Sequence, residues 1–390
     1  MTAKREFRGY KFLVTGIFVI EYGLQVVMPA VIHDTEPLST ILEICAAGIA
    51  AAFVVEFLLS PIGKSSARGI QVTPRSAMAV LIVGWFATLA GSLFGGIAYV
   101  NQITSAPASK VAAIFTPFEV WTLFGTALFF ALARDGLVTT RRALGLATIS
   151  FLLECGINYR GGTFGVAIGF GTLIVFLAVI TGVVRLRWIV PLLAVFLLVA
   201  QPLSNLRNEV RASLSQVAEV QNQSWTQRVR EDLLMAQVSD FTQIPTNFGY
   251  PSVGTLLRFG LLPRVLDRGR GNLNTGENFS VAVGGSSTNS NTATTFGDAY
   301  IEHKWPGVIF FGAAAAFVVG IITRRRGPWA LALLAVIFES TLMIESTFPD
   351  MLAIILQTML SMALAIVFSA ILMRRGHRDV VRELTTSAWP

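Results

Sequence analysis

Long apolar segments separated by short charged ones dominate the chain. A bilayer core needs about 20 mostly apolar residues for each crossing helix, which predicts about ten transmembrane helices here. Their predicted limits are 11–32, 38–60, 77–100, 111–133, 143–158, 162–184, 188–203, 306–323, 328–347 and 351–373. The pattern therefore predicts an all-α polytopic membrane protein, with the first apolar segment retained as a helix.

Lysine and arginine mark alternate loops of this pattern. Nineteen of the 30 basic residues lie in the N-terminal segment, in every second loop and in the C-terminal segment, whereas the opposite short loops contain only Lys110 and Arg160. Cytoplasmic loops are enriched in basic residues. We therefore expect both termini to be cytoplasmic, in agreement with an even number of spans.

These spans divide the chain into four parts. Residues 1–203 hold seven predicted spans, 204–305 a large extracytoplasmic loop, 306–373 three further spans and 374–390 a cytoplasmic tail. A loop of about a hundred residues is usually either functional or disordered.

The large loop changes character along its length. Apolar residues at helical spacing predict amphipathic helices near its start, with Leu206 and Val210 in one group and Leu233 and Ala236 in another. The low-complexity tract 284–295, GGSSTNSNTATT, is too polar to bury a core, and we expect it to be mobile.

The composition excludes a soluble globular protein. Apolar residues make up 53% of the chain and charged residues 14%, whereas soluble domains have about 25% charged residues. Cys45 and Cys155 lie in apolar segments, which leaves no disulfide framework or zinc cluster. The net charge of +7 arises mostly from the cytoplasmic loops, so it does not indicate a nucleic-acid partner.

The large loop contains a group of arginines without lysines. Between residues 251 and 271 these are Arg258, Arg264, Arg268 and Arg270, and Asp267 is the only acid among them. Arginine presents a rigid fork of donors that matches phosphate oxygens. The group suits a lipid diphosphate at the outer membrane surface. The alternatives are a solvated basic face or contacts with phosphates of the outer leaflet.

The sequence Asn158-Tyr159-Arg160-Gly161-Gly162 occupies the predicted outer turn between spans five and six. The paired glycines let backbone come close to a ligand. We expect Arg160 to make a second phosphate contact, or else to pair with Glu154.

Acidic residues and a histidine precede the eighth span, in the stretch FGDAYIEHKWPG at 296–307. Asp298 and Glu302 are four residues apart and so line one helical face. With His303 they form three candidate proton acceptors, which suits general-base chemistry on a sugar hydroxyl. The alternative is a solvated helix start at the membrane surface, anchored by Trp305.

Acidic residues also occur within the predicted spans, at Glu21, Glu43, Glu56, Glu119, Glu154, Glu339 and Glu345. Ionisable groups inside a membrane are functional candidates by default. Such a series is also typical of proton-coupled transporters, although the chain shows no internal repeat of the kind that many transporters have.

The layout of the spans, the turn NYRGGTFG and the loop end FGDAYIEHKWPGVIFFG together resemble the Wzy-type polymerases of the O-antigen polymerase and ligase group, with a GT-C-like membrane fold. The resemblance implies a metal-independent, inverting glycosyltransferase without a cofactor, in the bacterial inner membrane with its site facing the periplasm. It would join repeat units linked to undecaprenyl diphosphate into O-antigen, capsule or exopolysaccharide.

The resemblance also implies roles and partners. The diphosphate would be bound by Arg160, Arg258, Arg264, Arg268 and Arg270, and the acceptor proton would go to one of Asp298, Glu302 and His303. The partners would be lipid-linked donor and acceptor glycans, the bilayer and a chain-length regulator protein. The alternatives are a ligase that transfers the glycan to lipid A core or protein, and a flippase for the lipid-linked unit.

Overall fold

The protein is all-helical over the residues that its computed structural model describes. These are 12–60, 70–95, 109–161, 164–188, 230–239, 253–262, 294–325, 327–339 and 348–386, with a few separate positions between 191 and 281. Within these ranges the chain forms helices and no strand. The predicted all-α class is therefore confirmed.

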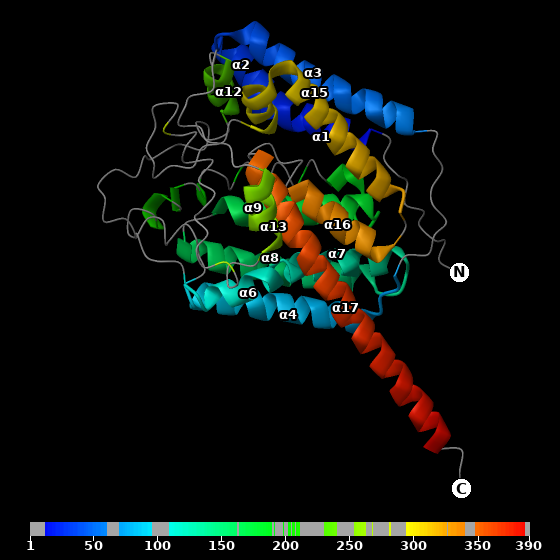
Figure 1. Ribbon diagram of the computed structural model, residues 1–390. Coiled ribbons are helices and arrows are strands. Elements are labelled where there is room, and N and C mark those ends of the chain that lie inside the picture. Colours follow the sequence, from blue (N-terminus) through cyan, green and yellow to red (C-terminus); the bar gives the residue numbers. More distant parts are fainter. Residues whose placement is uncertain are drawn as a thin grey trace.

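The helices follow one another along the chain with the labels of Figure 1. They are α1 (Leu13–Tyr22), the π-helical η1 (Gly23–Val27), α2 (Met28–His33), α3 (Leu38–Leu59), α4 (Pro74–Leu93), α6 (Ala112–Glu119), α7 (Trp121–Arg134), α8 (Thr140–Gly161), α9 (Phe164–Ile180), the 3-10 turn η2 (Leu186–Trp188), α12 (Glu231–Ser239), α13 (Val253–Leu261), α15 (Thr295–Thr323), α16 (Pro328–Ile337) and α17 (Phe348–Thr386).

Six stretches are long and apolar enough to cross a membrane. They are Leu13–His33, Leu38–Leu59, Pro74–Leu93, Ala112–Arg134, Thr295–Thr323 and Met351–Arg374. Each overlaps one of the ten spans predicted from the sequence. The protein is therefore a multi-pass membrane protein by the length and composition of its helices.

The other four predicted spans have different outcomes. The spans 162–184 and 328–347 correspond to shorter apolar helices, Val166–Ile180 and Pro328–Ile337. The span 143–158 lies in α8, which has 22 residues but includes Arg141, Arg142 and Glu154 and is not among the six apolar stretches. Most of the span 188–203 lies outside the described residues.

Two predicted boundaries do not coincide with helix ends. Helix α15 begins at Thr295, so the boundary at 305/306 between loop and span falls inside it. Helix α17 continues to Thr386 and leaves the bundle at its C-terminal end, so the predicted tail from 374 begins as helix (Figure 1). Pro306 stands at the first of these boundaries, just after the non-helical Lys304 that divides α15 into two helical segments. Helix α17 instead continues past Gly376 without a break.

The helices pack in two groups (Figure 1). One contains α1, η1, α2, α3, α12 and α15, and the other contains α4, α6, α7, α8, α9, α13, α16 and α17. Contacts between the groups come mainly from α15 with α16 and α17. Helix α15 therefore belongs to one group and joins it to the other.

Small residues allow the helices of the second group to approach closely. A Cβ atom on Gly84 of α4 would collide with the backbone of Thr122 of α7, and one on Gly125 would collide with Leu81. Helix α4 begins with a capping box between Thr73 and Ser76, which satisfies amides at the helix start. Close backbone approach at small residues is a usual basis of helix packing in membranes.

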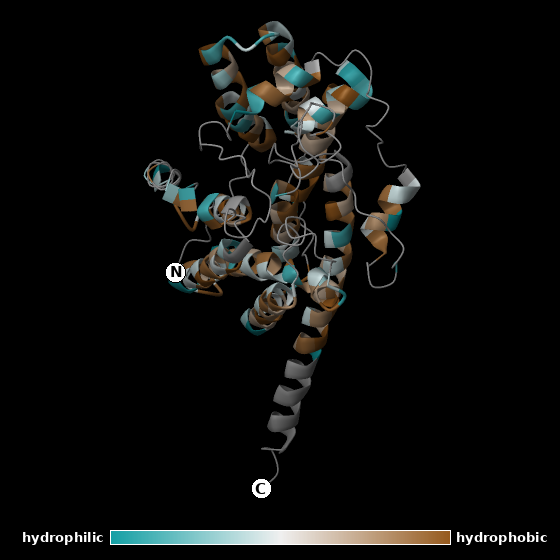
Figure 2. Ribbon diagram, turned by 90° about the vertical axis from the view of Figure 1, so that its left-hand side faces the viewer, coloured by the Kyte–Doolittle hydropathy of each residue, from teal (hydrophilic) through white to brown (hydrophobic). Residues whose placement is uncertain are grey.

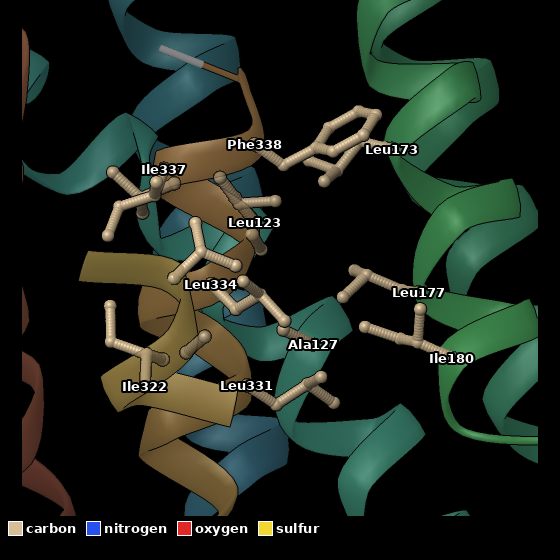
Figure 3. Packing of buried hydrophobic residues seen from close by; sticks show 14 of the residues in the cluster. Leu123, Ala127, Leu173, Leu177, Ile180, Ile322, Leu331, Leu334, Ile337 and Phe338 are labelled. Atoms are coloured by element: carbon tan, nitrogen blue, oxygen red, sulfur yellow. The ribbon is translucent and has the colours of Figure 1, made fainter. Parts of the chain in front are cut away.

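Aliphatic side chains fill the space between α7, α9, α15 and α16. Figure 3 shows Leu123 and Ala127 of α7 facing Leu331 and Leu334 of α16, with Leu177 of α9 nearby. Large apolar side chains such as Phe57, Phe86 and Phe310 are instead exposed, and hydrophobic residues occur along most of the helices (Figure 2). An apolar exterior over an apolar core is what a bilayer-embedded bundle requires.

Candidate functional site

Helix α15 folds back on itself near its N-terminal end. Lys304 has φ 53° and ψ −145°, which divides the helix into a part before it and a longer part after it. The rings of Phe296 and Phe311, on opposite sides of this bend, lie 6.0 Å apart. A Cβ on Gly307 would collide with the carbonyl oxygen of Ala299. The segment before the bend therefore lies against the segment after it (Figure 1).

The folded-back segment reaches the middle of α3. A Cβ atom on Gly48, near the centre of α3, would collide with the ring of Phe296. A Cβ atom on Gly312, after the bend, would collide with the carbonyl oxygen of Gly48. Both arms of the bend therefore meet α3 at the same level. Because α3 is a candidate span, the chain around Phe296 lies at the depth of the membrane interior.

Polar groups of the folded-back segment are satisfied inside the bundle. The Tyr22 hydroxyl lies 2.8 Å from Thr295 Oγ1 and accepts a hydrogen bond from the Phe296 amide at 2.9 Å. Thr294 Oγ1 accepts one from the Gly297 amide at 3.1 Å. These bonds satisfy the first amides of the helix, which have no partner within it. Irregular backbone at membrane depth occurs only where protein or water surrounds it, and here it is protein.

The three predicted proton acceptors lie in different environments. Asp298 is 1% exposed, whereas the side chains of Glu302 and His303 are 24% and 67% exposed. Asp298 is therefore not part of a solvated helix start, contrary to the surface position expected from the sequence. The reason is the bend at Lys304, which turns this end of the helix into the bundle.

Glu302 and His303 form a pair just before the bend. His303 Nε2 lies 3.6 Å from Glu302 Oε1, which is longer than a hydrogen bond. The Lys304 ammonium lies 4.8 Å from the centre of the Tyr300 ring, and Tyr300 and Trp305 pack edge to face at 5.3 Å. Aromatic and cationic contacts thus stabilise the bend that carries the pair.

Helix α12 of the large loop is tied to the first group by a buried carboxylate. Asp232 is fully buried and accepts hydrogen bonds from Thr35 Oγ1 at 2.7 Å and Arg230 Nη2 at 2.8 Å. The hydrogen bond to Asp232 raises the pKa of Arg230 above its ordinary value. Because Thr35 lies in the turn between α2 and α3, its hydrogen bond to the buried Asp232 fixes α12 against that turn.

Arg258, the one described member of the arginine group, is paired. Its Nε and Nη2 donate to the two carboxylate oxygens of Asp267 at 2.5 and 2.6 Å. Hydrogen bonding to Asp267 raises the pKa of Arg258 above its ordinary value. The arginine side chain is 51% exposed and the aspartate 10%.

Helix α13, which carries Arg258, is held against the beginning of the last span. Gln357 Nε2 of α17 donates to the Phe259 carbonyl at 2.8 Å. A Cβ on Gly260 would collide with the side chain of Leu356. Arg258 therefore stands beside the predicted outer end of a transmembrane helix, where lipid headgroups would lie.

The structure does not bring the whole predicted site together. The side chain of Arg160 and all of Arg264, Arg268 and Arg270 lie outside the described residues, as does most of the tract 284–295. Within the described part, Arg258 makes no hydrogen bond or ion pair with the Glu302–His303 pair, because α13 packs against α17 and α15 mainly against α3.

The acids of the spans separate into distinct roles. Glu56 binds the start of α1, with Oε1 2.8 Å from the Val14 amide and Oε2 3.0 Å from the Thr15 amide. Glu154 interacts electrostatically with Glu119 and Glu339, although the three are far apart in sequence. Glu56 is thus explained by helix capping, and the other three form an acidic group. Glu345 lies outside the described residues.

Sequence reasoning missed Tyr22, Thr35 and Asp232. Tyr22 is one of many aromatic residues in an apolar segment, and Thr35 lies in a short turn. Asp232 follows Glu231 in the first turn of α12, where acids are common on exposed helices. Only contacts between residues about 200 or more positions apart reveal them, and no local pattern encodes such contacts.

Comparison of the chain with models of protein families, with curated proteins and with solved structures gave no match.

Proposed function

We propose that the protein is a membrane glycosyltransferase that joins oligosaccharide repeat units linked to undecaprenyl diphosphate into a surface polysaccharide. The observation that carries this proposal is the bend of α15, which presents Glu302 and His303 side by side at an accessible position while the segment before it is fixed in the bundle. A general base must be both fixed and reachable by its substrate.

His303 takes the role of the base in this proposal. The acceptor hydroxyl attacks the anomeric carbon of the donor glycan, and its proton passes to the imidazole. The bond from that carbon to the diphosphate oxygen breaks with inversion, and undecaprenyl diphosphate leaves. Glu302 orients the imidazole and stabilises its charged form. Their 3.6 Å separation is compatible with this role, because catalytic hydrogen bonds often shorten only in the substrate complex.

Arg258 stabilises the leaving diphosphate, together with Arg160, Arg264, Arg268 and Arg270. Positive charge fixed where negative charge develops is often the largest contribution to catalysis. Asp298, which is buried, holds the fold of the loop end instead of meeting the acceptor. The proposed site faces the periplasm of a bacterial inner membrane, with a chain-length regulator as a further partner.

Reconstitution in liposomes tests this function. Purified protein supplied with lipid-linked repeat units should produce a ladder of longer glycans, and Arg258→Ala and Arg264→Ala should each abolish chain growth while inserting normally. Chain growth at the wild-type rate in both variants would contradict the diphosphate role. Transfer to lipid A core or to protein, with no ladder, would assign the related ligase activity instead.

A proton-coupled transporter of the lipid-linked unit is the second candidate. The acidic group of Glu119, Glu154 and Glu339 favours it, since carboxylates inside a membrane often carry protons. Under this alternative, protein-dependent flipping of a labelled lipid-linked sugar in liposomes should respond to a pH gradient and be lost in Glu154→Gln. Neither effect is expected of the glycosyltransferase.

A further inference from the structure

We propose that Asp267 is a positioning residue that orients the Arg258 guanidinium toward the diphosphate of a lipid substrate. This inference rests on the proposed function, because it concerns the same diphosphate contact. The sequence shows only that Asp267 is the one acidic residue among the arginines of this segment.

The edge of the guanidinium that Asp267 occupies determines which donors stay available. The carboxylate binds Nε and Nη2, at 2.5 and 2.6 Å. A guanidinium has five N–H donors, so both N–H groups of Nη1 and the second of Nη2 remain on the opposite edge. No other hydrogen bond of the Arg258 guanidinium is found among the described residues. That edge retains the fork geometry that phosphate oxygens match.

The two partners differ in exposure in the way that positioning requires. Asp267 is 10% exposed and Arg258 is 51% exposed. The carboxylate is thus enclosed, while the cation stays accessible to a ligand. Helix α13 is itself fixed on α17 by the bond from Gln357 and the close approach of Gly260 to Leu356. The backbone of Arg258 is therefore fixed by the packing of α13 on α17, and one edge of its guanidinium is fixed by Asp267.

Apolar side chains next to Arg258 favour a lipid diphosphate over a free one. Leu261 and Leu262 are both exposed, and they follow Arg258 by three and four residues, which places them on the same face of α13. The Leu262 amide still bonds to the Arg258 carbonyl at 3.1 Å, so the helical geometry extends to it. A headgroup at Arg258 would have its isoprenoid chain along these leucines.

Electrostatics alone predicts the opposite effect of losing Asp267. If this carboxylate only neutralised Arg258, then Asp267→Asn would leave more positive charge and bind the diphosphate more tightly. If it orients the fork, Asp267→Asn weakens binding although the local charge is more positive. The direction of the change therefore distinguishes the two roles.

The experiment measures binding of farnesyl diphosphate and inorganic pyrophosphate to the full chain in nanodiscs. Farnesyl diphosphate should bind the wild type, and Asp267→Asn should weaken it roughly tenfold or more, as expected for a lost charge-assisted hydrogen bond. Asp267→Glu should recover part of the affinity. Pyrophosphate should bind about tenfold more weakly than farnesyl diphosphate, because it gains no contact with the leucines.

The Arg134–Asp135 pair provides a matched control. It has a similar two-bond geometry, at 2.8 and 3.2 Å, at the predicted cytoplasmic end of α7, so Asp135→Asn should leave binding unchanged. Arg258→Lys keeps the charge but removes the fork, and it should lose as much affinity as Asp267→Asn. The double variant should lose no more than Arg258→Lys alone, because Asp267 acts through the arginine.

Several results would overturn the inference. Unchanged or tighter binding in Asp267→Asn, or additive losses in the double variant, would show that Asp267 does not orient Arg258, while the proposed function could stand. Equal affinity for pyrophosphate would remove the lipid assignment. Absence of diphosphate binding to the wild type would contradict the proposed function as well. If Asp267→Asn fails to insert, Arg258→Lys and Asp267→Glu give the same test.

Discussion

The Tyr22 hydroxyl accepts a hydrogen bond from the backbone amide of Phe296 at 2.9 Å, and the two aromatic rings stack with their centres 4.2 Å apart. This contact joins the first transmembrane stretch to the end of the large loop. It holds the start of α15 inside the bundle, and the position of Glu302 and His303 depends on it.

Replacing Tyr22 by Phe should destabilise the protein while preserving the ring stack. The buried amide of Phe296 would lose its acceptor, which costs about 1–3 kcal/mol for a buried unsatisfied group. Thermal unfolding in detergent should show a lower melting temperature. Tyr159→Phe is the control, because Tyr159 is exposed on α8, and it should change the melting temperature less. Equal stability of Tyr22→Phe and the wild type would contradict the role of this bond.

Adding a methyl group at Gly312 should force α3 and α15 apart. Its Cβ would collide with the Gly48 carbonyl oxygen, and overpacking of this kind typically costs about 1–3 kcal/mol. Gly16→Ala on α1 has open space around the new atom and should be neutral or stabilising, since glycine weakens a helix. The two variants should therefore shift the melting temperature by different amounts, and a smaller loss in Gly312→Ala than in Gly16→Ala would contradict this packing.

Substitutions at the bend should separate catalysis from folding. His303→Ala should reduce the rate of chain growth about 10²–10⁴-fold, the usual contribution of a general base, with little change in stability because the side chain is exposed. Glu302→Gln should give a smaller loss in rate. Asp298→Asn should instead lower the melting temperature, since this carboxyl is buried. Wild-type rates in His303→Ala would remove the imidazole from the proposed mechanism.

Chelation should leave the proposed transfer reaction intact. Arginines supply the positive charge at the diphosphate in this mechanism, so the rate of chain growth in EDTA should match the rate without it. Washing the liposomes in EDTA and restoring magnesium or manganese provides the measurement. A rate that falls in chelator and recovers with either cation would contradict a metal-independent reaction.

The amino-acid sequence alone predicts the membrane class and most of the long helices. Six predicted spans correspond to helices of sufficient length and hydropathy, because a crossing helix must be apolar along its length and a linear count detects this. The same count placed the start of span eight at 306, since residues 295–305 are polar enough to resemble a loop. Residues 295–303 are helical, and Tyr22 and Thr294 accept hydrogen bonds from their first amides.

Which polar residues meet depends on how the helices pack in three dimensions. The spacing of Asp298, Glu302 and His303 put them on neighbouring helical positions, but the bend at Lys304 and the close packing at Gly48 separated a buried carboxyl from an accessible pair. Likewise, Arg258 carries a fork of donors in any conformation of the chain, but only the fold pairs this fork with Asp267. Hydropathy is a sum over neighbours along the chain, whereas burial, pairing and orientation depend on residues that only folding brings together.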